Sequence, residues 1–137
     1  MNQQGDLPIG IFRTYDIRGI VEEDLTVDRI RQIGLGLGLH LAEGNARQIV
    51  VGHDVRESSP RFAEAMTEGL CSAGLDVVEI HDVPTPVLYW AVKHLNCDGG
   101  VMITGSHNPI NYNGLKITRG LYPIWGDELQ LLHGKCL

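Results

Sequence analysis

The chain has 137 residues, of which 43% are hydrophobic and 20% charged, values typical of one globular domain with a core of its own. This balance excludes intrinsic disorder, and no apolar run approaches the roughly 20 residues of a membrane-spanning helix. The net charge of −6 argues against a nucleic-acid-binding surface, although a local cationic cluster can still bind an anionic small molecule.

The start of the chain is not predicted to be a signal peptide. Its first ten residues lack the basic and apolar regions of a signal peptide, and we therefore expect a cytoplasmic protein. The three cysteines have no C-x-x-C spacing, which fits neither a disulfide framework nor a zinc site. Cys71 and Cys97 lie in apolar stretches and are expected to be buried.

The first part of the chain predicts a short extended segment followed by a helix. Residues 12–20 mix β-forming and charged residues, which is typical of a short strand or an extended loop. In residues 26–44 the apolar side chains alternate with glycines, as in a strand, but they also recur at helical spacing. Because this run is too long for a typical strand, we predict a helix capped by Thr26. Gly34 and Gly38 would then share one face and allow close packing.

The rest of the chain alternates strands with helices. Ser59-Pro60 and Thr85-Pro86 each predict an N-cap followed by proline at the first helical position. Strands are expected at 48–53, 76–83, 99–104 and 115–118, and helices at 59–73, at 85–95 and from about 126 onward. This order predicts a three-layer α/β/α fold with a mixed, mostly parallel sheet of about four to five strands, to which the last strand can add antiparallel. We expect a single domain over residues 1–137.

The segment that follows the strand at 99–104 has the clearest chemical character. The strand leads into Thr104-Gly105-Ser106-His107-Asn108-Pro109, at the edge of the sheet where ligands of open α/β folds bind. Ser106 is thereby presented on a loop as a candidate nucleophile or phosphoryl carrier. The window 104–120 has no acidic residue but holds His107, Lys116 and Arg119. This window therefore predicts a local positive site suited to phosphate.

Other catalytic templates do not fit this segment. The nucleophile elbow G-x-S-x-G and the P-loop G-x-x-x-x-G-K-[ST] are both absent. His107 directly follows Ser106, which is poor geometry for a serine–histidine triad built from distant residues. His40 and Glu43 lack the second histidine of a helical metal motif. Taken singly, the residues also fit structural roles, Ser106 as a turn residue and Lys116 as a solvated strand-end lysine.

Five segments form an ordered set of motifs. Phe12-Arg13-Thr14-Tyr15-Asp16-Ile17-Arg18-Gly19 contains Y-D-I-R-G, and residues 51–59 contain G-x-D-x-R-x-S. Pro84-Thr85-Pro86 follows, then the serine loop at 104–109, then Asn113-Gly114-Leu115-Lys116 with the pattern N-G-x-K. Together they resemble domain 1 of the α-D-phosphohexomutases, the phosphomannomutase/phosphoglucomutase family. Because the motifs occur in family order, over about residues 10–132, their joint match is more specific than any one of them.

The resemblance implies a phosphoryl-transfer site. Ser106 would carry a phosphoryl group in the resting enzyme, donate it to a hexose monophosphate, and take a phosphate back from the bisphosphate intermediate. The phosphate would thereby move between the 1- and 6-positions of the sugar. Lys116 is implied as the general acid/base, and His107 as an aid to proton transfer or to phosphoryl binding.

The resemblance also implies the surroundings of that serine. Arg18 would pair with phosphate through its fork of donors, and Tyr15 and Asn108 would line the substrate site. Mg²⁺, bound through the phosphate on Ser106, would neutralise the phosphoryl oxygens. Arg56 is expected to pair with Asp54 or another carboxylate. The implied partners are hexose phosphates, namely the 1-phosphates, 6-phosphates and 1,6-bisphosphates of glucose or mannose, with no nucleic acid and no membrane.

Only the first of the family's four domains is matched. The resemblance assigns the Mg²⁺-binding loop, the sugar loop and the phosphate-clamping loop to domains 2, 3 and 4, and this chain has no D-x-D motif. We therefore expect domains 2–4 to be absent, mutase turnover by the isolated chain to be negligible, and self-association through the face that domain 2 covers. Two further hypotheses stay open: a stand-alone phosphosugar-binding module without turnover, and an interaction remnant without a ligand. The preferred sugar is not specified.

Overall fold

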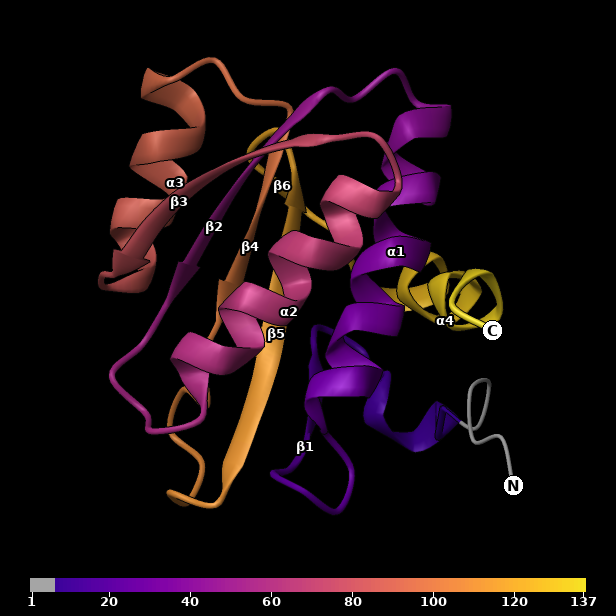
Figure 1. The fold of residues 1–137 in the computed structure, drawn as a ribbon, viewed down its shortest axis with the longest axis vertical. Coiled ribbons are helices and arrows are strands. Elements are labelled where there is room, and N and C mark those ends of the chain that lie inside the picture. Colours follow the sequence, from indigo (N-terminus) through magenta and orange to yellow (C-terminus); the bar gives the residue numbers. More distant parts are fainter. Residues whose placement is uncertain (1–6) are drawn as a thin grey trace.

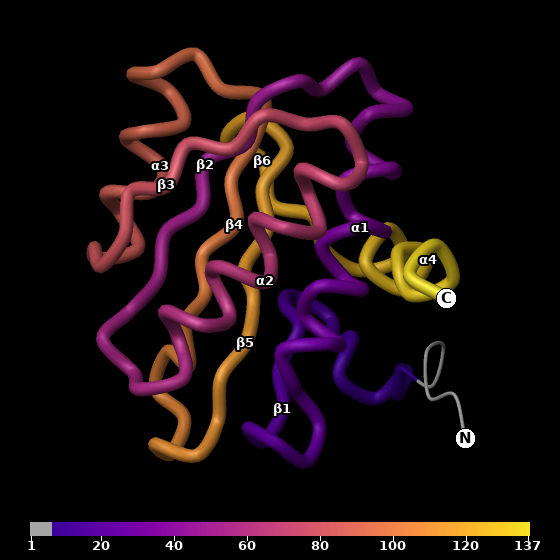
Figure 2. Tube along the Cα trace, in the orientation of Figure 1, coloured from indigo at the N-terminus to yellow at the C-terminus, as the bar shows by residue number. Residues whose placement is uncertain are grey.

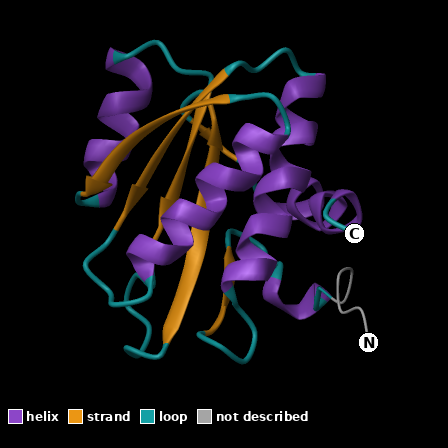
Figure 3. Cartoon of the chain, viewed as in Figure 1, coloured by secondary structure: helices purple, strands orange, loops and turns teal. Residues whose placement is uncertain are grey.

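A mixed sheet with helices on both faces forms the framework of the molecule (Figure 1; Figure 3). The computed structural model describes residues 7–137, so residues 1–6 of the predicted domain lie outside the described part. The elements in chain order are a 3₁₀ turn η1 (Ile9–Ile11), β1 (Ile17–Ile20), α1 (Val27–Glu43), β2 (Gln48–His53), α2 (Ser59–Ser72), β3 (Asp76–Asp82), α3 (Thr85–His94), β4 (Gly99–Ile103), β5 (Tyr112–Arg119), β6 (Tyr122–Pro123) and α4 (Gly126–Lys135).

The sheet has the strand order β1-β5-β4-β2-β3, with β6 paired to the end of β5. β2 runs parallel to both β3 and β4, whereas β5 runs antiparallel to β4 and β1. The predicted mixed sheet and its antiparallel last strand are therefore confirmed. The five strands on the main path match the predicted number; the two-residue strand β6 is additional and is too short to show a periodic pattern. β1 covers only the last part of the strand or loop expected at 12–20.

Two apolar clusters separate the layers. The larger one lies between the sheet and α1, α2 and α4, and includes Ile33, Phe62 and Val101. The smaller one lies under α3 and includes Leu88 and Met102. The predicted three-layer α/β/α architecture is thus confirmed. No helix of residues 7–137 is long and apolar enough to cross a membrane.

The ambiguous run at 26–44 is a helix. Thr26 caps it, since its hydroxyl oxygen accepts a hydrogen bond from the Arg29 amide at 3.2 Å. A carbon added at Gly34 would lie 2.8 Å from the carbonyl oxygen of Met66 in α2, and one added at Gly38 would lie 2.6 Å from Cβ of Ala73. The prediction that these two glycines allow close packing is therefore confirmed.

Three local predictions were wrong. The N-cap of α2 is Ser58 rather than Ser59, because the Ser59 hydroxyl donates to Asp54 instead. The N-cap of α3 is Pro84, and Thr85 is already helical. Cys71 is exposed, while Cys97 is buried as expected, because Cys71 lies on the outer face of α2.

Candidate active site

Two loops meet at one end of the sheet. Because β2 and β4 are parallel neighbours, the loops that follow them leave the sheet at the same end (Figure 2). The first loop begins at Asp54, whose amide donates to the carbonyl of Ile103 at 2.9 Å. The second loop begins at Thr104 and carries Ser106. The segment with the G-x-D-x-R-x-S motif is thereby in direct contact with the serine loop, although the two lie about 50 residues apart in the chain.

The Asp54 carboxylate organises the beginning of the serine loop. It accepts hydrogen bonds from the Gly105 amide at 3.0 Å and the Thr104 hydroxyl at 3.1 Å. It also accepts from the Arg56 amide and the Ser59 hydroxyl. Burial acts to raise the pKa of Asp54, but these hydrogen bonds outweigh it and hold the pKa below its ordinary value. Asp54 is therefore an ionised acceptor that fixes the loop backbone.

Arg56 holds the rest of the serine loop from the other side. Its guanidinium donates to four backbone carbonyl oxygens between the serine and the start of β5. The acceptors are those of Ser106 at 3.2 Å, Asn108 at 2.8 Å, Pro109 at 2.6 Å and Tyr112 at 3.0 Å. Its Nε lies 3.3 Å from Oδ2 of Asp54, so the ion pair predicted for Arg56 is confirmed. A side-chain carbon at Gly105 would lie 2.1 Å from Cζ of this guanidinium. Glycine at this position is therefore required for the arginine to pack against the loop.

Ser106 is exposed at the tip of this arrangement and has a left-handed backbone, with φ of +54°. Its amide donates to the Thr104 hydroxyl at 3.0 Å. A non-glycine residue in this conformation carries strain of about 1 kcal/mol, which persists only where the surroundings enforce it. The contacts of Asp54 and Arg56 provide that enforcement. They present a hydroxyl to solvent on a fixed backbone.

Arg18 and Lys116 lie on the sheet face that carries α3. Ile17, Leu115 and Ile117 belong to the core under α1 and α2, and neighbouring strand residues point to opposite faces. Arg18 is 8% exposed and donates from Nη1 to the Gly105 carbonyl at 3.0 Å; its other terminal nitrogen pairs with Asp16. Lys116 is half-buried and lies opposite Met102.

This part of the face lies beside α3 rather than beneath it. α3 packs on β2 and β4, whereas Arg18 and Lys116 lie on β1 and β5, which are beyond β4 in the strand order. Arg18, which is ion-paired with Asp16, and Lys116 therefore lie on the same face of the sheet, next to the serine loop that Arg18 touches. Arginine and lysine side chains of this kind can bind phosphate.

The remaining predicted site residues differ in how firmly they are held. Asn108 is half-buried and donates from its amide group to the Gly105 carbonyl at 3.1 Å. His107 is exposed at the tip of the loop beside Ser106. Tyr15 is exposed and stacks on Trp125, with ring centroids 5.7 Å apart. Asn108 thus shapes the loop, while His107 and Tyr15 face solvent.

Sequence reasoning missed the loop-holding roles of Asp54, Arg56 and Asn113. Asn113 is fully buried and donates to the hydroxyl oxygens of Ser58 and Ser59 at 2.8 and 3.0 Å, joining β5 to the start of α2. In the sequence, these three residues could be noticed only as parts of the motifs G-x-D-x-R-x-S and N-G-x-K. The spacing of the two motifs along the chain does not show that they are in contact in the fold.

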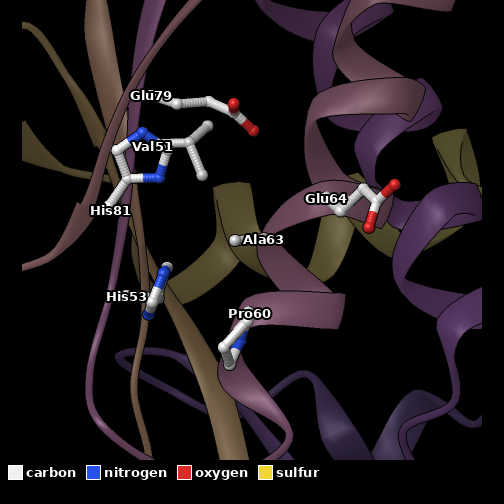
Figure 4. Close-up of a pocket in the computed structure, with 7 residues that line it drawn as sticks. All are labelled: Val51, His53, Pro60, Ala63, Glu64, Glu79 and His81. Carbon is white, nitrogen blue, oxygen red and sulfur yellow. The ribbon is translucent and has the colours of Figure 1, made fainter.

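A separate pocket of about 280 Å³ lies between α2 and the β2–β3 edge (Figure 4). It is lined by Val51, His53, Pro60, Ala63, Glu64, Glu79 and His81. None of the predicted site residues lines it, and Val51 belongs to the core on the α1–α2 face. The pocket is therefore not the site around Ser106.

The sequence of this chain matches a family of known proteins. The family model for phosphoglucomutase/phosphomannomutase, alpha/beta/alpha domain I, matches residues 10–122. The chain belongs to this family. It is 40% identical over 126 residues to the phosphomannomutase/phosphoglucomutase of Pseudomonas aeruginosa (strain PAO1), covering 92% of this chain and 27% of that protein. It is 44% identical over 108 residues to a Xanthomonas campestris pv. campestris (strain B100) protein named phosphohexose mutases, covering 79% of this chain and 23% of that protein.

A solved structure shares the fold of this phosphoglucomutase/phosphomannomutase domain. It is a family protein from Burkholderia thailandensis, 36% identical, with a TM-score of 0.89 over 95% of this chain and 30% of that chain. The predicted membership of this family, with the match to its domain I, is thus confirmed. This chain spans about a quarter of the length of the curated relatives that it matches.

Metal binding in this family domain was predicted through Ser106. Among residues 7–137, no three His, Cys, Asp or Glu side chains are placed to hold a metal ion. The donors described here therefore do not fit a complete Mg²⁺ site. A phosphoryl group on Ser106 would supply anionic oxygens to Mg²⁺, whose remaining coordination positions are often filled by water.

Proposed function

We propose that the chain is the phosphoserine-bearing domain of a phosphohexomutase, in which Ser106 accepts a phosphoryl group from a hexose bisphosphate and returns it to a hexose monophosphate. The observation that carries this proposal is the serine loop itself. Ser106 is exposed with a left-handed backbone, and the loop that carries it is fixed by Asp54, Arg56 and Arg18 through hydrogen bonds. Such fixed presentation suits a transfer that depends on positioning and charge stabilisation.

The transfer step is a displacement at phosphorus. Oγ of Ser106 forms a bond to the phosphorus of the bisphosphate while the bond from that phosphorus to a sugar oxygen breaks. The serine proton passes to a base, and the departing sugar oxygen takes up a proton. We assign general acid/base work to Lys116, with assistance from His107, and stabilisation of the phosphoryl oxygens to the cations Arg18 and Lys116.

Tyr15 and Asn108 complete the proposed substrate site, and hexose phosphates are the proposed substrates. Mg²⁺ enters the proposal only as a counter-ion to the phosphoryl group on Ser106. The residues described here supply no further ligand set for it. In this proposal the chain itself supplies the nucleophile, Ser106, and two cations, Arg18 and Lys116.

The proposal is tested by intact-protein mass spectrometry before and after incubation with glucose 1,6-bisphosphate and Mg²⁺. We expect the wild-type chain to gain one phosphoryl group. Ser106→Gly is the matched control, because glycine adopts the positive φ of this position without strain, so the loop keeps its shape but loses the hydroxyl. No gain by a folded wild-type chain, or an equal gain by Ser106→Gly, would contradict the proposal.

A coupled assay for conversion of glucose 1-phosphate to glucose 6-phosphate tests full turnover. We propose negligible turnover by this chain alone, since positioning by the loops assigned to further domains is worth about 7–11 kcal/mol in favourable cases. Rates near those of an intact mutase would overturn this. Recovery of activity when those domains of a relative are added in trans would support the enzyme reading over that of a binding module.

A further inference from the structure

Two aromatic side chains form an exposed but ordered pair. Tyr15 is 72% exposed and Trp125 is 54% exposed. Their rings nevertheless stack, with centroids 5.7 Å apart and planes inclined by 14°. Such an offset stack contributes about 0.5–1.5 kcal/mol beyond simple burial. The pair therefore presents an ordered aromatic surface that a ligand could contact.

The backbone under both rings is fastened. The Gly126 amide, next to Trp125, donates to the carbonyl of Thr14 at 2.6 Å. The turn that carries Tyr15 is closed by the Arg13 amide, which donates to the Asp16 carbonyl at 2.9 Å. The stack is therefore built from two restrained segments more than a hundred residues apart. Its exposure does not come from a loose loop.

The pair lies beside the cations of the proposed site. The Ile124 amide donates to the Ile117 carbonyl at 2.9 Å, so the segment that leads into Trp125 runs beside the stretch of β5 that contains Lys116. Tyr15 precedes Arg18 by three residues at the start of β1, the neighbouring strand. The segments that carry Tyr15 and Trp125 thus adjoin β1 and β5, the two strands that carry Arg18 and Lys116. This combination suits a ligand with a phosphate at one end and an apolar ring face at the other.

We infer that Trp125 is a positioning residue that holds Tyr15 at the mouth of the site, and that the stacked pair contacts the ring of a hexose phosphate. The inference rests on the proposed function for the phosphate-binding end. It adds that Trp125 fixes the ring of Tyr15, which the proposed function already places in the substrate site. The pair should discriminate a sugar phosphate from a phosphate ester that has no ring.

The test is an NMR titration of the chain, following the amides of Gly105 and Gly114, with glucose 6-phosphate and separately with methyl phosphate. Methyl phosphate has the same monoester head but no ring. The wild-type chain should bind glucose 6-phosphate more tightly. Trp125→Ala should lower the ratio of the two affinities by about 2- to 10-fold, because the stack is lost. Trp125→Phe should restore most of that ratio, since a ring remains.

Two controls separate positioning from stability. Trp90 is 61% exposed and stacks on His94 at 4.4 Å, so Trp90→Ala removes a comparable exposed stack on α3 and should leave the ratio unchanged. Tyr15→Ala should lower the ratio as Trp125→Ala does, and the double variant should be no worse than either, because the two rings act as one unit.

The inference is overturned if the wild-type chain binds neither ester, if it binds both equally, or if Trp125→Ala keeps the wild-type ratio. Failure of the proposed function is seen separately, as absence of phosphorylation at Ser106. If Ser106 is phosphorylated but the ratio of the two affinities does not depend on Trp125, the proposed function is supported and this inference is wrong. If the ratio depends on Trp125 but Ser106 is not phosphorylated, this inference is supported and the proposed function is wrong.

Discussion

The two faces of the sheet are built on opposite principles. On one face α1 and α2 approach each other so closely that Gly34 and Gly69 have no room for a side chain. On the other face α3 packs on β2 and β4, and Arg18 and Lys116 lie on β1 and β5, beyond β4 in the strand order. The first face is held by apolar packing, whereas the serine loop beside Arg18 is held by directional polar contacts. Stability and presentation of the site are thus assigned to different surfaces of one sheet.

The largest expected effect is on the first face. A methyl group at Gly69 would lie 2.4 Å from the carbonyl oxygen of Arg31 and 2.6 Å from the amide nitrogen of Leu35. Because both neighbours are backbone atoms, Gly69→Ala should destabilise the fold by about 1–3 kcal/mol despite its better helix propensity. Urea denaturation measures this. Gly134→Ala in α4 meets nothing within 4 Å and should stabilise by roughly 0.5–1 kcal/mol, so equal effects at the two positions would refute the packing argument.

The next effect is on the serine loop. Arg56→Ala leaves the carbonyl groups of the loop without their common donor, and we expect a loss of about 1–2 kcal/mol in the free energy of unfolding. Hydrogen exchange should accelerate at the amide of Asn108, which donates to the Gly105 carbonyl. Arg56→Lys should not rescue either readout, because one ammonium group cannot reproduce the fork. Arg61→Ala removes surface ion pairs with Glu57 and Glu22 and should cost no more than about 1 kcal/mol.

A smaller effect depends on pH. The hydrogen bonds to Asp54 outweigh its burial and lower the pKa of its carboxyl group in the fold. Asp54 therefore stabilises the fold above the ordinary carboxyl pKa of about 4, and this contribution is lost as the pH falls through the lowered value. Asp54→Asn should be less stable than wild type at pH 7, and the difference should shrink below about pH 4. Denaturation curves across this range measure it, and a constant difference would argue against the assignment.

The smallest effect is chemical rather than energetic. Cys71 is exposed, whereas Cys97 and Cys136 are buried. Burial raises the pKa of the Cys136 thiol to about 12 and also raises the pKa of Cys97, so both stay protonated at neutral pH. Iodoacetamide should label Cys71 alone in the native chain, and Cys71→Ser should change stability by less than about 0.5 kcal/mol. Rapid labelling of Cys136 would show that α4 opens from α1.

Local pattern determined the order of strands and helices, the mixed sheet and the close packing at Gly34 and Gly38. Each of these features depends on the spacing of apolar residues along the chain or on the small size and backbone freedom of glycine. Both can be read from short stretches of sequence. The positive segment around Ser106 and Lys116 was also visible, because the charges lie within one short window. Where patterns were equivocal, as at the caps of α2 and α3, the prediction missed by one residue.

Only the tertiary structure decided what holds the site. Asp54 and Arg56 reach a loop about 50 residues away because β2 and β4 happen to be neighbours, and no spacing along the chain encodes that adjacency. The left-handed backbone of Ser106 and the stack of Tyr15 on Trp125 arise in the same way. A hydrogen bond or a stack depends on distance and direction between groups, and those are set when distant strands pair.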